Sequence, residues 1–486
     1  MNIASDIISL VWRLTLVAGL VSLWGLAPAT AQEALCEDKP APKISPYKGV
    51  YFANDFSYLD DPCLSRNDPR DSFSRFVDQW KRVKVGSSIV VEFGGEYRIR
   101  YHDENNHAKT KLNGADNDFT LSRLRLYMNT KIGKSVRIYA EVVDAASVGE
   151  DLPPRGIEVN RWDVLNAFVE YRTGGPDGKI MLRVGRQELM YGAQRFISPL
   201  DWSNIRRSFD AVRVDYENSD FSVSGFYGNL RKVRAHRKDG TDGSLTFAGL
   251  YGTYKGWAGQ TVETYILRLE ETAGAAANFE LFTLGSRLKG GKANLMWEAE
   301  GAYQWGSFGA LDQRAAMFSA ALGYKLGNAL PFKPVVWAYY DWASGDSDPT
   351  NGKRGTFHQH FPLGHAYLGF MDLVGRQNIQ DLSARLITKP HAKVTLILTG
   401  HSFSLVERLD GLYNAGGGRI RFDPTGAAGT DVGEEFDIVV KFALMQRAEL
   451  MLGYSKFWGG SFIDATNPVG VSGNASFFYS QFSIKF

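Results

Sequence analysis

The sequence predicts an all-β protein, a single large antiparallel transmembrane β-barrel of about eighteen strands behind a short irregular N-terminal periplasmic segment. Three observations carry this prediction. The chain ends on a strand with one apolar and one polar face. Strand-like runs are joined alternately by long and short connections, as in outer-membrane barrels. After the N-terminus, no segment has the roughly eighteen consecutive apolar residues that a transmembrane helix needs.

Residues 1–31 are expected to form a cleaved signal peptide. Arg13 precedes the apolar run 14–26, and Ala29-Thr30-Ala31 supplies small residues for cleavage before Gln32. The alternative is a membrane anchor, but the apolar run is too short to span a bilayer comfortably. A signal peptide predicts export of the chain to the periplasm.

Residues 32–86 are expected to form an irregular periplasmic segment, because prolines interrupt it repeatedly. We expect a lead-in to the barrel, with a partial plug of the barrel as the alternative. The chain's two cysteines, Cys36 and Cys63, lie in this segment. An oxidising periplasm favours a disulfide between them, and two free thiols are the alternative.

The barrel is predicted to occupy residues 87–486. Runs of alternating apolar and polar residues define its strands. The first nine are 89–102, 119–132, 134–147, 162–173, 178–187, 209–217, 220–229, 243–255 and 260–269. The second nine are 278–288, 292–306, 312–325, 333–343, 377–389, 392–404, 432–444, 447–458 and 474–486.

The connections between these runs alternate in length. Long connections such as 103–118, 188–208 and 344–376 are followed by short ones such as Gly133 and Asn218-Ser219. The connection 307–311 departs from the pattern, because it is short where a long one is expected. Short periplasmic turns and longer outer loops produce this alternation when both termini lie in the periplasm.

Charged residues lie on the face of each strand opposite to the apolar one. In the run 121–129, Leu124, Leu126 and Met128 oppose Arg123 and Arg125. Lipid would cover the apolar face, so the charged face is expected to line a water-filled lumen. Barrels of sixteen to eighteen strands leave an aqueous channel, and the sequence therefore predicts a pore.

Several segments resemble the alginate export porin family. They include LRVGRQELMYGAQRFISPLDWSNIRRSFDAVRVDY (182–216), ASGDSDPTNGKRGTFHQHFPLGHAYLGFMDLVGRQN (343–378), ERLDGLYNAGGG (407–418) and GTDVGEEFDIVVKF (429–442). The resemblance spans roughly 51–486. It implies an eighteen-strand outer-membrane barrel of a Gram-negative-type bacterium. It also implies an arginine-rich constriction that attracts anionic polyuronate.

The candidate pore-lining residues are arginines, because a carboxylated polymer needs fixed positive charge in a confined pore. Arg186 and Arg376, each in a Gly-Arg-Gln triplet at an outer strand end or loop base, match the family's motif, and the others are expected to face inward by strand alternation. The full set is Arg98, Arg100, Arg123, Arg125, Arg137, Arg183, Arg186, Arg213, Arg376 and Arg385.

Carboxylates on the same faces are expected to pair with these arginines across neighbouring strands. The candidate counter-charges are Glu96, Glu170, Asp215, Asp381 and Asp437. If these arginines and carboxylates neutralise each other, they would form a rigid polar wall that does not attract an anionic solute. The sequence therefore predicts a porin for an anionic or polar, alginate-like poly- or oligosaccharide, with a general or neutral-solute porin as the alternative.

Other motifs contribute less. Asp346 and Asp348 sit in a calcium-like loop, but its glycine comes one residue late and no glutamate closes it, so an external turn is favoured. No nucleophile and base, phosphate-binding loop or zinc motif stands out. The chain is thus expected to work without catalysis, cofactor or nucleic acid, with membrane lipid and solute as partners. An outer-membrane barrel enzyme and a non-conducting structural barrel are the remaining alternatives.

Overall fold

The structure is a computed structural model that describes residues 46–486, except 62, 65–67, 176, 273, 275–277 and 328–329. The chain divides into two compact units, Met1–Ile44 with Ser57–Pro69 and Ser45–Phe56 with Arg70–Phe486. The described part of the first unit contains the 3-10 helix η3 (Ser57–Asp60). It also contains Cys63, which is disulfide-bonded. The predicted signal peptide and Cys36 lie outside the described residues.

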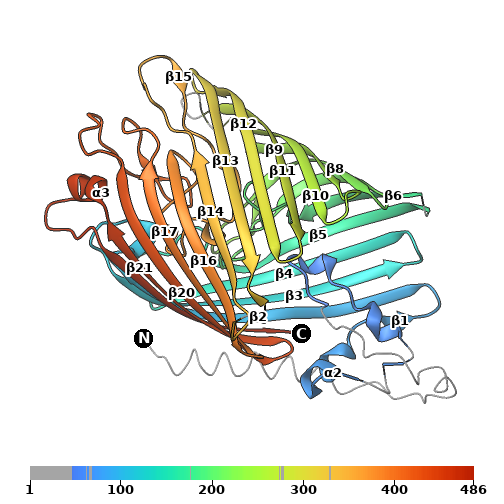
Figure 1. Ribbon diagram of the computed structural model, residues 1–486. Helices are drawn as coiled ribbons and strands as arrows, with labels where there is room; N and C mark the ends of the chain where they lie inside the picture. Colours follow the sequence, from blue (N-terminus) through green and yellow to red (C-terminus); the bar gives the residue numbers. More distant parts are fainter. Residues whose placement is uncertain are drawn as a thin grey trace. The chain divides into compact units, whose positions relative to one another are not determined.

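The second unit contains a closed antiparallel barrel of 18 strands, which confirms the predicted fold class (Figure 1). The first nine strands are β2 (Ile89–Asn105), β3 (Asn117–Ile132), β4 (Val136–Val148), β5 (Asn160–Gly175), β6 (Gly178–Gln187), β7 (Phe209–Glu217), β8 (Phe221–Lys232), β9 (Gly240–Tyr254) and β10 (Gln260–Glu271). The second nine are β11 (Phe279–Lys292), β12 (Leu295–Phe308), β13 (Leu311–Lys325), β14 (Val335–Ala343), β16 (Ile379–His391), β17 (Val394–Leu405), β20 (Asp431–Met445), β21 (Ala448–Gly459) and β22 (Ala475–Lys485). Each barrel strand pairs with its neighbours in this order, and each predicted run coincides with one of them.

The terminal strand β22 closes the barrel against β2, in a register that runs from Glu96 opposite Lys485 to Asn105 opposite Ser476. Gly95 and Phe486 extend this pairing, since each main-chain N–H donates to the other residue's carbonyl at 2.7 and 3.0 Å. A Cβ atom on Gly95 would lie 2.9 Å from the Phe486 ring and closer still to Arg125. Glycine is therefore required where the last residue docks.

The remaining elements are short. The strands are β1 (Val83–Val85), β15 (Lys353–Arg354), β18 (Leu412–Tyr413) and β19 (Arg419–Arg421), and the helices are α2 (Ser72–Asp78), α3 (Ser461–Thr466), η2 (Tyr51–Ala53), η4 (Ala108–Thr110) and η6 (Gly364–Ala366). Asp71 caps α2 by accepting a hydrogen bond from the Ser74 N–H at 2.7 Å. None of the helices among the described residues is long and apolar enough to cross a membrane.

Short turns gather at one end of the barrel, which we call the periplasmic end. Gly133 (φ +59°) turns the chain between β3 and β4 in the left-handed conformation that favours glycine. The longer connections lie at the other end, and the β12–β13 turn is short as predicted. The alternation in connection length thus reflects the two ends of one barrel.

The two faces of the wall differ in character as the alternation predicts. On β3, the side chain of Met128 is 40% exposed, whereas Arg123 and Arg125 are 1% and 0% exposed. Val169 on β5 and Leu382 on β16 are likewise exposed on the outer face. The outer surface is therefore apolar, and the charged side chains are enclosed.

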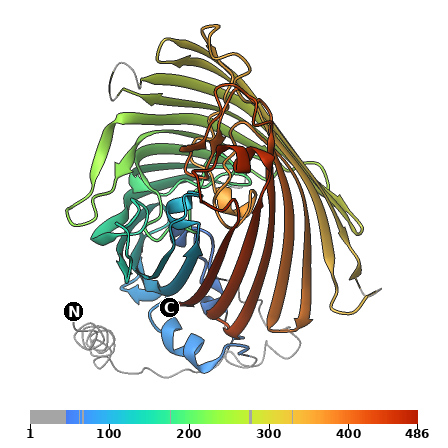
Figure 2. The same ribbon diagram turned by 90° about the vertical axis from the view of Figure 1, so that its left-hand side faces the viewer.

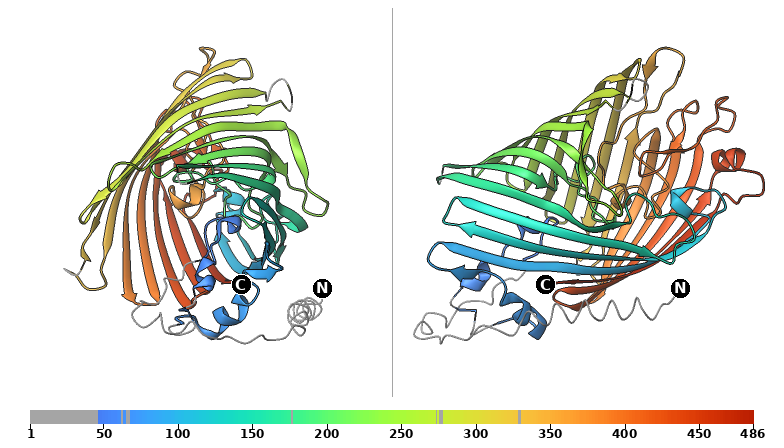
Figure 3. Two further views of the ribbon diagram at one scale, coloured as in Figure 1. Left: turned by 90° about the vertical axis from the view of Figure 1, so that its right-hand side faces the viewer. Right: turned by 180° about the vertical axis from the view of Figure 1, so that it is seen from behind.

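The interior of the barrel is occupied by inward-folded segments rather than by wall side chains alone. The short helix η6, in the loop between β14 and β16, lies inside the ring of strands in two views (Figures 2 and 3). The connection 188–208 joins it there, because the Ile197 and Phe361 main chains form a β-bridge. This inward folding was not predicted from the sequence.

Candidate functional site

The N-terminal stretch 46–56 lies against the inner wall near the periplasmic end. The Tyr51 hydroxyl donates a short hydrogen bond to Glu96, and the Arg125 guanidinium lies 3.9 Å from the centre of the Tyr51 ring. Phe52 packs edge-on against Phe168 at 5.3 Å between ring centres. These contacts are possible because β2, β3 and β5 present their charged and aromatic residues inward.

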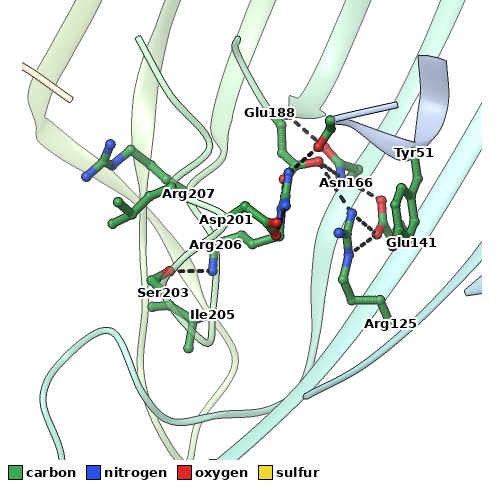
Figure 4. A network of polar contacts seen from close by, with 12 residues as sticks. Tyr51, Arg125, Glu141, Asn166, Glu188, Asp201, Ser203, Ile205, Arg206 and Arg207 are labelled. Atoms are coloured by element: carbon green, nitrogen blue, oxygen red, sulfur yellow. Dashed lines mark hydrogen bonds and ion pairs between the residues drawn. The ribbon is translucent and has the colours of Figure 1, made fainter. Parts of the chain in front are cut away.

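A buried ion-pair network connects this stretch with the connection 188–208 (Figure 4). Arg125 binds Glu141 at 2.6 Å and lies 3.8 Å from Glu188. Arg206 binds both Glu188 and Asp201 through short contacts.

Arg123 extends the network to the predicted counter-charge Glu96. Its guanidinium lies 2.5 Å from Glu96 and 2.9 Å from Asp201. Most charge in this region is therefore neutralised locally, and the loop is attached to the wall by charge-assisted bonds.

Three of the predicted pore-lining arginines, Arg98, Arg100 and Arg385, differ from Arg123 and Arg125 because they contact neutral oxygens. Arg98 donates to the carbonyl oxygens of Asp201 and Ser203 at 2.8 and 2.9 Å. Arg100 donates to the Trp202 carbonyl at 2.9 Å, and its guanidinium lies 3.7 Å from the centre of the Trp202 ring.

Arg385, the third of these arginines, donates to the Ala366 carbonyl at 3.0 Å and to Thr399 at 3.2 Å. Within the described residues, Arg98, Arg100 and Arg385 form no ion pair with a carboxylate. Their guanidinium groups therefore hydrogen-bond only to main-chain and neutral side-chain oxygens.

The other inward-facing predicted arginines are mostly paired. Arg183 lies 2.6 Å from Glu170, Arg213 lies 2.8 Å from Asp215, and Arg376 lies 2.7 Å from Asp341. Arg137 donates to Asn129 at 2.7 Å and to the Phe52 carbonyl. The predicted pairing of arginines with Glu170 and Asp215 is thus present in the geometry.

Asp381 and Asp437 have a different partner from the one we expected. His401 Nδ1 lies 3.0 Å from Asp381, and its Nε2 lies 3.7 Å from Asp437. Asp437 also accepts a hydrogen bond from Ser455 at 2.6 Å. These two carboxylates therefore belong to a group around His401 on β16, β17, β20 and β21.

Arg186 is a correction to the predicted set, because it points outward. It shares a face of β6 with Val184 and Leu182, which are 49% and 41% exposed, whereas Arg183 on the opposite face is buried. Arg186 pairs with Asp210 at 2.8 Å on the same outward face. The motif match located Arg186 at the end of a strand, but the direction of its side chain follows from the alternation along that strand.

Residues missed by the sequence analysis complete the interior. Arg195 binds Glu298 and Glu300 at 2.5 and 2.8 Å, and so attaches the connection 188–208 to β12. Arg206 and Arg207 lie in the same connection. The sequence did contain a signal for these residues, because Arg195, Arg206 and Arg207 lie within the segment 182–216 that resembles the alginate export family.

The two inward-folded loops contact each other at an aromatic stack. The rings of Trp202 and His365 are 3.7 Å apart at 12°, and the Tyr367 hydroxyl donates to the Ala193 carbonyl. The Met371 N–H donates to Glu435 at 3.0 Å and fixes the second loop to β20. Together the loops occupy part of the barrel interior beside Arg98 and Arg100, and we call this region of contact between Trp202 and His365 the constriction.

The calcium candidates Asp346 and Asp348 form an external turn in the structure. Asp348 accepts hydrogen bonds from the Thr350 N–H and hydroxyl at 3.0 and 2.6 Å, which hold the pKa of its carboxyl below the usual range. The Asp346 N–H donates to Asp410 at 3.0 Å. Among the residues described, no group of three or more His, Cys, Asp or Glu is arranged to hold a metal ion.

A closed barrel of 18 antiparallel strands with an apolar outer face and a charged inner face defines the class of outer-membrane porins. The profile of the alginate export family matches residues 90–475. The chain therefore belongs to the alginate export family, which together with the barrel places it in the outer membrane as a porin. Among curated proteins, no relative matches the chain.

Solved structures with the same fold are outer-membrane proteins of Pseudomonas aeruginosa. OpdO has 13% sequence identity and a TM-score of 0.54, over 82% of this chain and 97% of that chain. OccK8 (OprE) has 12% identity and a TM-score of 0.54, over 82% and 98%. The outer membrane protein OprD has 11% identity and a TM-score of 0.52, over 84% and 96%. This likeness concerns the fold.

Proposed function

We propose that this porin passes an anionic, alginate-like poly- or oligosaccharide through its arginine-bearing lumen. The observation that carries the proposal is the environment of Arg98, Arg100 and Arg385. These guanidinium groups face the interior without a carboxylate partner among the described residues, and they lie beside the constriction formed by the loops. A polymer with one carboxylate per sugar supplies the charge that these groups lack.

The same contacts suggest how the constriction opens. The arginines attach the loops by binding main-chain carbonyls, such as those of Asp201 and Ala366. A carboxylate makes a stronger, charge-assisted bond to guanidinium than a neutral carbonyl does. A uronate that reaches Arg98 or Arg385 can therefore replace the loop as acceptor. Substrate binding would weaken the attachment of the loops to the wall and widen the path.

A second candidate is a porin for neutral or general solutes. It is favoured by the ion pairs of Arg123, Arg125, Arg183, Arg213 and Arg376, which leave little unbalanced charge along much of the wall. In that case the arginines would only hold the loops in place. The two candidates differ in how the channel responds to a charged and to a neutral oligosaccharide.

The test is planar-bilayer conductance with ion selectivity, with polyuronate or an uncharged polysaccharide of equal length as blocker. For the wild type we expect anion selectivity and block by polyuronate alone. For the double variant R98A/R100A we expect about tenfold weaker polyuronate block, since two charge-assisted bonds are lost. R268A is the matched control, because Arg268 pairs with Glu280 on the outward face of β10.

Three results would count against the anionic substrate. They are cation selectivity of the wild type, equal block by the charged and uncharged polymers, and unchanged polyuronate block in R98A/R100A. Equal block by both polymers with intact conductance would establish the general porin instead.

A further inference from the structure

A cavity of about 420 Å³ lies at the periplasmic end, between the N-terminal stretch and the inner wall. Phe52, Ala53 and Asn54 border it on one side, and the ends of β3, β4 and β5 with the turn at Gly133 border it on the other. Its volume falls within the range of small-molecule binding sites. It is separate from the constriction at Trp202 and His365.

The charged side chains of β4 and β5 that line the cavity lie on the inner face of the wall. Arg137, Glu170 and Arg172 line it, and they alternate with Ile138 and Val169, which are exposed on the outer face of the same strands. Its other wall is the N-terminal stretch, whose Phe52 packs on inward-facing Phe168. The cavity is therefore bounded by the inner face of the wall and the N-terminal stretch, and not by the lipid-facing surface.

The lining carries a surplus of positive charge. Four cationic side chains, those of Lys131, Lys134, Arg137 and Arg172, line the cavity with one carboxylate, that of Glu170. Glu170 is buried and already bound by Arg172 at 2.5 Å and by Arg183 at 2.6 Å, and Arg137 lies 3.8 Å from it. Its charge is therefore more than balanced before any ligand binds.

Two of the cations are available to a ligand. Lys134 is exposed and makes no hydrogen bond or ion pair with the described residues. Lys131 has a side chain that is 39% exposed and a loose contact of 3.4 Å with Glu92. Arg137, by contrast, is fixed by bonds to Asn129 and Phe52 and gives the cavity a rigid cationic base. Two exposed lysines beside a hydrogen-bonded arginine are suited to a ligand with several carboxylates.

From this arrangement we infer that the cavity is a binding site for a segment of an anionic oligosaccharide at the periplasmic mouth, with its carboxylates on Lys131, Lys134 and Arg137. The inference rests on the proposed function and assigns the site where the polymer is bound before it meets the constriction. The N-terminal stretch then forms one wall of a substrate site. A segment of a few sugar units would bridge the lysines and the buried arginine.

The test is calorimetric titration of the full-length protein in detergent with hexauronate, with a neutral hexasaccharide and with inorganic phosphate. We expect the wild type to bind hexauronate and not the neutral sugar. The double variant K131A/K134A should bind it about tenfold more weakly, because two charge-assisted contacts are lost. The matched control is K289A/K292A, which removes two exposed lysines at the β11–β12 turn of the same end.

A second variant tests the cavity without changing charge. Ala53 is exposed at the cavity edge, so A53W should fill the space and also weaken hexauronate binding about tenfold. Equal affinity of the wild type and both variants would overturn the inference, and so would a site that binds phosphate as tightly as hexauronate. If polyuronate still blocks wild-type conductance in that case, the proposed function survives and only this site is wrong. If the wild type neither binds hexauronate nor is blocked by polyuronate, both proposals fail.

Discussion

Arg125 shows how strongly a single buried ion pair can matter in this barrel. It is fully buried, bound to Glu141 and close to Glu188, and it supports the Tyr51 ring. Replacing it by alanine would leave the buried Glu141 carboxylate without its cation, while Glu188 would keep its contact with Arg206. Breaking a buried pair in this way costs about 3–5 kcal/mol. We expect R125A to lower the free energy of unfolding by that amount, measured by urea unfolding in lipid vesicles.

The matched control for R125A is R314A. Arg314 and its partner Asp312 are both exposed, with side chains that are 61% and 47% accessible. Exposed pairs contribute little to stability, so R314A should unfold as the wild type does. Equal unfolding of R125A and the wild type would show that water or the neighbouring arginine Arg206 replaces the lost charge.

Lys81 predicts a pH dependence of stability at the periplasmic end. Burial lowers the pKa of Lys81 from 10.5 to about 7, and repulsion from Arg447 adds to this effect. Between these pH values the unfolded chain keeps a proton that the folded chain has lost. Stability should therefore rise as the pH increases from about 7 to about 10.5, by at most about 1.4 kcal/mol per pH unit.

Thermal unfolding across this pH range measures the contribution of Lys81. Because methionine does not titrate, K81M should lose this rise while keeping most of the packing against Phe56, which lies 4.9 Å from the Lys81 ammonium. K84M serves as the control, since Lys84 is exposed on β1. A rise of equal slope in K81M and the wild type would assign the effect to another group.

At the scale of elements, the strands were predictable because their signal is periodic. In β3, successive side chains point alternately to lipid and to the interior. Leu124, Leu126 and Met128 therefore lie on the lipid-facing side, and Arg123 and Arg125 on the inner side. The alternation in connection length then distinguished the periplasmic end of the barrel from the outer end. The loops carry no such period. Their inward folding depends on contacts with distant residues, such as Trp202 with His365, which no local pattern reveals.

The N-terminal stretch 46–56 is predicted to restrict conductance as an element. Phe52 holds it in place, since its ring packs on Phe168 and on the Arg183 guanidinium at 4.4 Å. We expect F52A to release the stretch and to raise single-channel conductance in planar bilayers. F76A is the control, because Phe76 is 46% exposed on α2. Identical conductance of F52A and the wild type would mean that the loops alone set the restriction.

At the scale of the whole molecule, the interior charges were predictable in location and not in pairing. Alternation placed Arg98, Arg100 and Arg385 on the inner face, but it did not indicate their partners. Arg98 and Arg100 bind the distant connection 188–208, and Arg385 binds the loop that precedes its own strand. The error for Arg186 arose because a motif match does not specify which face of a strand a residue occupies. Which arginines remain without a carboxylate is therefore a property of the folded barrel.

The balance of charges also predicts how salt affects transport. The net charge of the chain is only +2, so attraction of a polyanion depends on local groups, the exposed lysines at the periplasmic mouth and the enclosed arginines at the constriction. Raising the salt concentration from about 0.1 M to about 1 M shortens the screening length from about 10 Å to about 3 Å. Long-range attraction by the lysines is then screened, whereas contacts inside the barrel are affected much less.

We therefore expect salt to act on the association rate of polyuronate block. Over this range the association rate should fall about tenfold or more, while the dissociation rate changes only slightly, because electrostatic steering governs the encounter. Single-channel block kinetics measure both rates, and block by an uncharged polysaccharide provides the baseline. K131A/K134A should show a weaker salt dependence of association than K289A/K292A. A salt effect confined to the dissociation rate would place the dominant attraction at the constriction and not at the periplasmic mouth.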